Sequence, residues 1–140
     1  MPDQVWVPAD HEFLVKEHIK ALLTVRGKSF TAGLGVPSKW DTNSLDHVQV
    51  GGVVDTIDQG WGRTDPIRTQ GPTQITVWSE NSTAAKALAN LCLGLLIVAR
   101  PPAPLTSISP IGGVFPARDE HTHAELAFFK VHVSANTVLG

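Results

Sequence analysis

The chain has 140 residues, with 11 basic and 13 acidic side chains, six histidines and one cysteine. This length suits one domain, 1–140, with an ordinary hydrophobic core. The mildly acidic balance without a Lys/Arg run disfavours sequence-specific DNA binding, the single cysteine excludes an internal disulfide, and no stretch has the length that a membrane span needs.

The first predicted helix starts at Asp10, which can cap it, and carries Val15, Ile19 and Leu22 along one stripe. It should stop near Gly27, because glycine readily adopts the left-handed turn after a helix. Residues 29–36 predict a weak strand, since Gly33 and Gly35 interrupt them and Pro37 follows. A polar loop is expected at 41–46.

A clearer strand is predicted at 47–50, where Gly51 and Gly52 then mark a bulge or bend. The following segment, 55–72, is rich in glycine, proline and polar residues, so we expect a long loop there. Loops of this length in compact domains are usually functional or mobile. This one contains Trp61, Arg63 and Arg68.

The strongest local pattern is a strand at 73–79 that runs directly into a helix. Ile75 and Val77 alternate with polar neighbours, and Asn81 or Ser82 can cap the helix. The apolar positions Leu88, Leu91, Cys92 and Leu95 then recur at helical spacing. Cys92 therefore reads as a packed thiol rather than a reactive one.

After the prolines at 101–104, a short strand is predicted at 105–109 and a long one at 127–135. A polar turn, 119–123, precedes the long strand. Consecutive strands with short connections favour antiparallel pairing, and two amphipathic helices can cover one face. We therefore predict an α+β fold: a mostly antiparallel sheet of four to five strands with two helices packed on one face.

Known enzyme motifs fail on their spacing. Gly27-Lys28-Ser29 lacks the glycine that a phosphate-binding loop needs five residues earlier, and His11-Glu12 lacks a second histidine one turn on. The turn Asp119-Glu120-His121-Thr122-His123 could hold a metal through its histidines and carboxylates, but a solvated turn is the favoured interpretation. We expect no catalytic site, no metal and no cofactor.

Two aromatic side chains, Trp78 and Phe128, are expected on the sheet face away from the helices. Two interpretations stay open. Large aromatics on an open sheet face are typical anchors for another protein chain. Alternatively, the 55–72 loop with Trp61 folds over them and forms a second small core.

Several segments together resemble a known family. They are 30–40, Val48-Gln49-Val50-Gly51-Gly52, Asp65-Pro66-Ile67 through Thr76-Val77-Trp78, the helix around Ala84 to Ala89, and the strand 127–133. These are similar to segments of the tail terminator, or tail completion, proteins of long-tailed, non-contractile phages, especially those of actinobacterial hosts. The family strand is richer in arginine where this chain has Lys130 and His132.

The resemblance implies a structural virion protein, assembled in the host cytoplasm, that forms a homohexameric ring at the head–tail junction. The ring would cap the tail tube, end tail polymerisation and join the head connector. Its implied partners are further copies of itself, the tail-tube protein and the connector protein; genomic DNA would pass through without specific binding, and no membrane is involved. The candidate interface residues are Trp61, Arg63, Arg68, Trp78, Asp119, Glu120, Phe128 and Lys130.

Three alternatives remain at this point. The chain could be another neck or connector ring component of the same particle. It could be a small metal-dependent hydrolase that uses Asp119 or Glu120 with His121 and His123. It could also be an ordinary ligand-binding domain.

Overall fold

The computed structural model describes residues 5–7, 9–36, 40, 45–51, 58–59, 68–119 and 124–139. Two helices and eight strands occur in this part of the chain. In chain order they are β1 (Trp6–Val7), α1 (His11–Val25), β2 (Thr31–Gly33), β3 (His47–Val50), β4 (Asp58–Gln59), β5 (Arg68–Ser79), α2 (Ser82–Val98), β6 (Leu105–Arg118), β7 (Glu125–Asn136) and β8 (Val138–Leu139).

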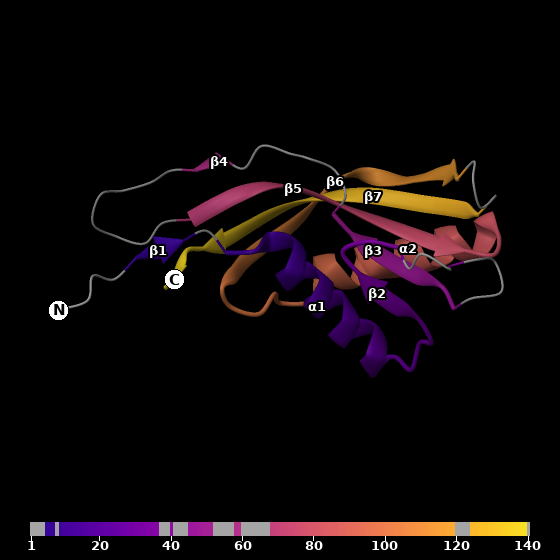
Figure 1. Cartoon of the computed structure of the whole chain (residues 1–140), viewed down its shortest axis with the longest axis horizontal. Helices are drawn as coiled ribbons and strands as arrows, with labels where there is room; N and C mark the ends of the chain where they lie inside the picture. The colour runs from indigo at the N-terminus through magenta and orange to yellow at the C-terminus, as the bar shows by residue number, and fades with distance from the viewer. Residues whose placement is uncertain are drawn as a thin grey trace.

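The main sheet has the order β2-β3-β5-β7-β6, and β4 pairs with the first part of β5. Every pairing in it is antiparallel except that of β2 with β3. Figure 1 shows both helices on one side of this sheet, while β1 and β8 form a separate small pair. The predicted α+β class is thus confirmed, as a mixed but mostly antiparallel sheet.

Both helices begin at the residues that the sequence indicates. The Asp10 side chain accepts a hydrogen bond from the Phe13 amide (3.1 Å), and Asn81 accepts one from the Ala84 amide (2.8 Å). Each bond satisfies one of the amide groups that a helix start leaves without a partner. After α1, Gly27 adopts a φ of 71°, the left-handed conformation expected for a residue that ends a helix.

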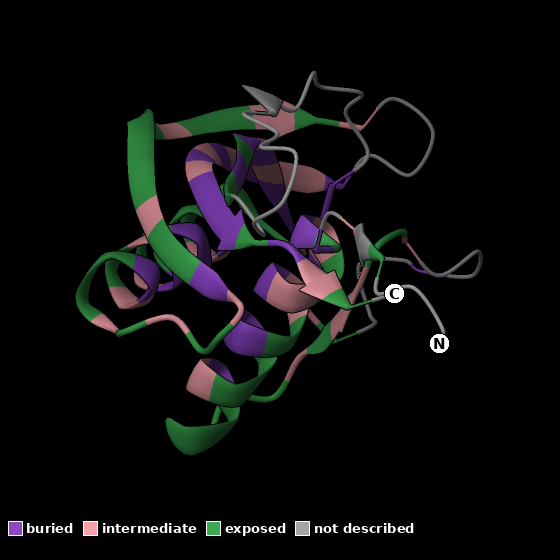
Figure 2. Cartoon of the chain, turned by 90° about the vertical axis from the view of Figure 1, so that its left-hand side faces the viewer, coloured by how far each residue is buried: buried purple, intermediate pink, exposed green. Residues whose placement is uncertain are grey.

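The hydrophobic core lies between the helices and the inner face of the sheet. On β5 and β7 the inward residues are fully buried, and they pack against Ile19 and Leu23 of α1 and Cys92 and Leu96 of α2. Burying one such large side chain contributes about 1.5–3 kcal/mol. Figure 2 shows this buried layer enclosed by exposed ribbon. The inward residues are Ile75, Val77, Ala127, Phe129, Val131, Val133 and Ala135.

The prediction of a loop at 55–72 is wrong for two segments, which form strands. Asp58–Gln59 forms β4, and residues 68–72 are the first part of β5. The ladder continues through Gly71 and Pro72, which lie opposite Val133 and His132 of the long strand β7. A proline lacks an amide donor, but the residues before and after Pro72 pair with β7, and this pairing keeps the strand extended through the proline. Residues 52–57 and 60–67 lie outside the described part.

The strand predicted at 105–109 is much longer than expected. β6 runs to Arg118 as an edge of the sheet, although it contains Pro110 and Pro116. Edge strands tolerate proline because one side of their backbone needs no partner. Its pairing with β7 is irregular between Ile111 and Phe115, where Gly112 has a φ of 72°. β6 changes direction part way along, which Figure 2 shows as a corner in the exposed ribbon.

At the opposite edge, the predicted strand 29–36 is shorter than expected. Only Thr31–Gly33 pairs, in parallel, with β3. The His47 side chain of β3 forms two hydrogen bonds to the segment that contains β2. Its Nδ1 accepts from the Thr31 hydroxyl (2.7 Å), and its Nε2 donates to the Gly35 carbonyl (2.6 Å). Of the predicted polar loop 41–46, residues 45–46 are described and have no regular structure.

Candidate interaction surface

The outer face of the sheet, away from the helices, carries the aromatic residues that the sequence singles out. Side chains alternate between the two faces of a strand, so the neighbours of the buried Ile75, Val77 and Phe129 point outward. These outward residues include Trp78, Phe128 and Lys130, all of them half-buried. Their partial burial has two different causes, one at each end of the face.

Trp78 is covered by another tryptophan. The rings of Trp78 and Trp40 meet edge to face, with centroids 5.6 Å apart and an interplanar angle of 69°. Trp78 Nε1 donates to Gln49 Oε1 (3.2 Å), and Trp40 Nε1 donates to the Leu45 carbonyl (2.9 Å). Trp78 thus belongs to a small second core, as one interpretation predicted, but its cover is Trp40. The predicted cover, Trp61, lies outside the described residues.

Phe128 lies in a different environment, beside an open apolar hollow. Its ring packs against Phe115 of β6, with centroids 5.7 Å apart. The hollow has a volume of about 460 Å³, and most of its surface is apolar. Ile111 and Phe115, at its rim, remain 43% and 53% exposed. We call this feature the outer hollow; its lining residues are Ile111, Gly112, Phe115, Phe128 and Lys130.

Lys130 is the one charged residue among the described residues that line the outer hollow. In the sheet it lies between Gln74 of β5 and Ile111 of β6. It forms no ion pair with any residue that the structure describes. The outer hollow therefore combines apolar walls with one cation that is not neutralised within this part of the chain, an arrangement suited to an apolar group with a nearby carboxylate.

The bend of β6 creates the outer hollow. Gly112 has left-handed backbone geometry, and a Cβ built on it would lie 3.8 Å from the Phe115 ring. Here three residues of β6, at 112–114, lie between two successive pairings with β7. The extra length carries the strand away from the ladder and leaves space over Phe128.

Of the remaining predicted interface residues, the two that the structure describes, Arg68 and Asp119, do not line the outer hollow. Arg68 is exposed at the start of β5, whereas the hollow lies at the Phe128 and Lys130 positions of the ladder. The Asp119 amide donates to the Ala124 carbonyl (3.0 Å), which closes the connection between β6 and β7. Trp61, Arg63, Glu120, His121 and His123 lie outside the described residues, and the described residues contain no cluster of three potential metal ligands.

Three buried histidines lie in the body of the protein rather than at the hollow. His11 Nε2 is 2.9 Å from the Thr69 hydroxyl, and His47 holds β2 as described above. His18 Nε2 is buried without a hydrogen-bond partner among the described residues. Burial lowers the pKa of all three, because the charged imidazolium loses its hydration. At neutral pH these groups are uncharged and serve packing.

Cys92 is buried on α2, as its spacing predicts. Burial raises the pKa of the thiol to about 12, so the nucleophilic thiolate is scarce near neutral pH.

Within the described residues, no helix is long and apolar enough to cross a membrane.

Fold and surface together define a two-layer α+β protein whose outer sheet face carries an apolar hollow. Comparison of the sequence with protein-family models and with curated protein sequences found no match in either case.

Proposed function

We propose that the protein is a structural component of a phage virion, a tail terminator. Copies of the chain would assemble into a ring that caps the tail tube, ends tail polymerisation and joins the tail to the head connector. The proposal starts from the resemblance of the segments described above. The observation that carries it is the outer hollow, an apolar site that the described chain leaves open to solvent.

An open apolar surface supports a role in assembly. Exposed apolar side chains that line a hollow can take up an apolar group of another protein. Here Ile111 and Phe115 are exposed on a sheet edge, next to Phe128. A ring requires heterologous contacts, in which one patch meets a different patch on the next copy. A protomer with helices on one face and the apolar outer hollow on the other offers two unlike surfaces for this purpose (Figure 1).

The charge of the chain is compatible with a passage for DNA. Its formal net charge is −2, and it has no cluster of basic residues in the sequence. Tight DNA binding depends on clustered Lys and Arg that displace counterions from phosphates. A ring built from this chain would let the genome pass without holding it. The partners would be the tail-tube protein and the connector protein.

Electron microscopy of the purified protein with tail tubes tests the proposal. We expect rings in the protein alone, and caps on tube ends that stop further addition of tube subunits. Phe115→Ser should reduce capping, whereas Val98→Ser, at an exposed apolar residue on the helix side, should leave it unchanged. A chain that stays monomeric and never binds tube ends would refute the proposal. Binding to the connector ring without binding to tube ends would instead assign the chain to another part of the neck.

A further inference from the structure

The outer hollow has the properties of a receptor for an aromatic side chain. Its walls include the tilted pair Phe115 and Phe128, whose ring planes differ by 32°. Aromatic rings add favourably to such pairs in edge-to-face or offset geometry. Lys130 then favours a carboxylate next to the incoming ring. The expected occupant is thus a phenyl group with an acidic neighbour.

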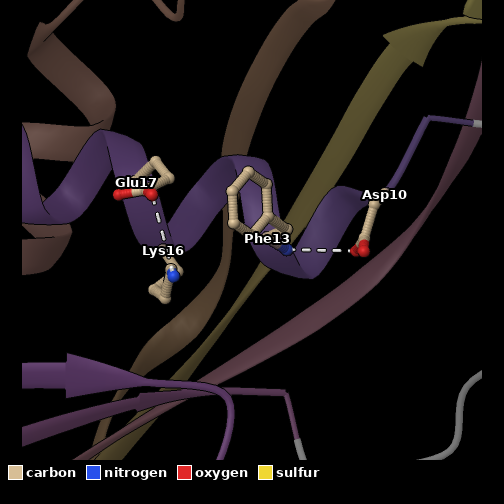
Figure 3. A network of polar contacts seen from close by, with 4 residues as sticks. All are labelled: Asp10, Phe13, Lys16 and Glu17. Carbon is tan, nitrogen blue, oxygen red and sulfur yellow. Dashed lines mark hydrogen bonds and ion pairs between the residues drawn. The ribbon is translucent and has the colours of Figure 1, made fainter.

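The same chain displays such a group on its other layer. Among the residues whose burial the structure describes, the exposed aromatic side chains are Phe13 and Phe115. Phe13 lies on α1 about 200° round the helix from Val15, a core residue, and therefore points away from the sheet. Figure 3 shows Phe13 on the outside of α1 between Asp10 and Glu17.

The surroundings of Phe13 leave one side of its ring available. Lys16 Nζ lies 4.6 Å from the ring centroid, over one face. Lys16 also lies 3.8 Å from the Glu17 carboxylate, so the lysine charge is partly neutralised. Phe13 remains 43% exposed despite these contacts. A second copy could therefore bury the ring, with Asp10 or Glu17 close to the cation of the receiving copy.

We infer that Phe13 of one copy inserts into the outer hollow of the next, with Lys130 facing a carboxylate of the incoming α1. This inference rests on the proposed ring and specifies the contact that would build it. The two surfaces lie on opposite layers of the protomer, the helix layer and the outer face of the sheet. Each copy thus gives one surface and receives the other, the head-to-tail arrangement that generates rings.

Disulfide cross-linking between two variants, each with one introduced cysteine beside the native Cys92, tests the contact. Glu17→Cys places a thiol one turn from Phe13, and Ser109→Cys places one on the same face of β6 as Ile111, two residues away. Both positions are exposed, and the buried Cys92 is a poor competitor. A mixture of the two variants should form a covalent dimer under mild oxidation, and neither variant alone should do so.

Two further variants control for chance encounters. Val25→Cys is on the same helix as Glu17→Cys but about 18 Å from Phe13 along the axis, and should cross-link to Ser109→Cys at least about tenfold less. Adding Phe13→Ala to the Glu17→Cys chain should also lower the yield about tenfold, the loss expected for removing an aromatic anchor. Lys130→Glu should weaken association by up to about fivefold, and Glu17→Lys in the partner should restore it.

The outcomes separate this contact from the function itself. Rings or tube caps without the Glu17–Ser109 cross-link would overturn the inference and leave the proposed function standing. A protein that stays monomeric at high concentration and ignores tube ends would overturn both. A monomer that takes up decanoate, an apolar carboxylate, and shows no cross-link would make the hollow a small-ligand site and also overturn the inference.

Discussion

At the scale of single residues, His18 and Thr137 each have a buried side-chain polar atom without a hydrogen-bond partner among the described residues. For His18, on α1, this atom is Nε2. His11 and His47, by contrast, each contact a threonine hydroxyl. An unpaired buried polar atom costs about 1–3 kcal/mol relative to a satisfied one.

Burial also couples these histidines to pH. Since the pKa of each is lowered in the folded protein, the unfolded chain binds protons more readily as the pH falls through about 6.5, the ordinary histidine value. The folded form is therefore fully stabilised above that pH. It loses stability as the pH falls toward the lower folded-state values, and levels off below them.

Replacing His18→Leu should increase stability and weaken this pH dependence. At pH 8 we expect a gain of about 1 kcal/mol from removing the unpaired nitrogen, and a larger gain at pH 5, where wild-type His18 favours unfolding. Urea unfolding at the two pH values measures both effects. Lys20→Leu, at an exposed position on the same helix, controls for the added leucine. Parallel pH profiles for His18→Leu and wild type would contradict this account.

At the scale of secondary structure, the two faces of the sheet have different roles. Phe129 of β7 points into the core and is completely buried, whereas Phe115 of the adjacent β6 is about half exposed on the other face. Replacing one phenylalanine at a time therefore measures how much each face of the sheet contributes to stability.

Phe129→Ala should destabilise the protein by about 3–5 kcal/mol, because it leaves a cavity between sheet and helices. Phe115→Ala should cost about 1 kcal/mol, mainly its ring contact with Phe128. Urea midpoints compared at equal slope measure both changes. Equal losses for the two variants would show that the outer face is a structural core rather than a free surface.

The accuracy of prediction from sequence also varied by element. Helix starts were predictable because Asp10 and Asn81 act on amides only three residues away. The beginning of β5 and the second half of β6 were not, since glycine and proline there look like breakers. What holds both is distant in sequence, namely the long ladder along β7.

The candidate surface, too, was only partly predictable from the sequence. Strand alternation correctly placed Phe128 and Lys130 on the outer face. Ile111 and Phe115 were missed because they flank the bend of β6, in a segment that no periodicity marks. Trp40 was missed as the cover of Trp78 because that contact joins segments 38 residues apart in sequence, and nothing local to either one indicates it.

At the scale of the whole molecule, the reaction of the Cys92 thiol with a reagent can be used to measure opening of the core. The thiol is buried on α2, next to Ile19, Leu22 and Leu23 of α1. Reagent can therefore reach the sulfur only when the packing around α2 opens.

Native protein at pH 8 should therefore react with a thiol reagent at least about a hundredfold more slowly than protein in 8 M urea, because exposure of Cys92 requires opening of the core. Absorbance of the released chromophore follows the reaction. Phe129→Ala should accelerate it and Phe115→Ala should not. Rapid reaction of the native wild type would mean that α2 detaches independently of the rest.

The prolines of β6 have a further consequence. This long strand has no neighbouring strand on its outer side in the described part of the chain, and such a border can serve as a template for fibre growth. Pro110 and Pro116 lack amide hydrogens, and a corner separates the two halves of the strand. A strand of another molecule that paired with β6 would lack hydrogen-bond donors at the two prolines and could not follow the bend. We therefore expect this edge to resist pairing with a strand of another molecule.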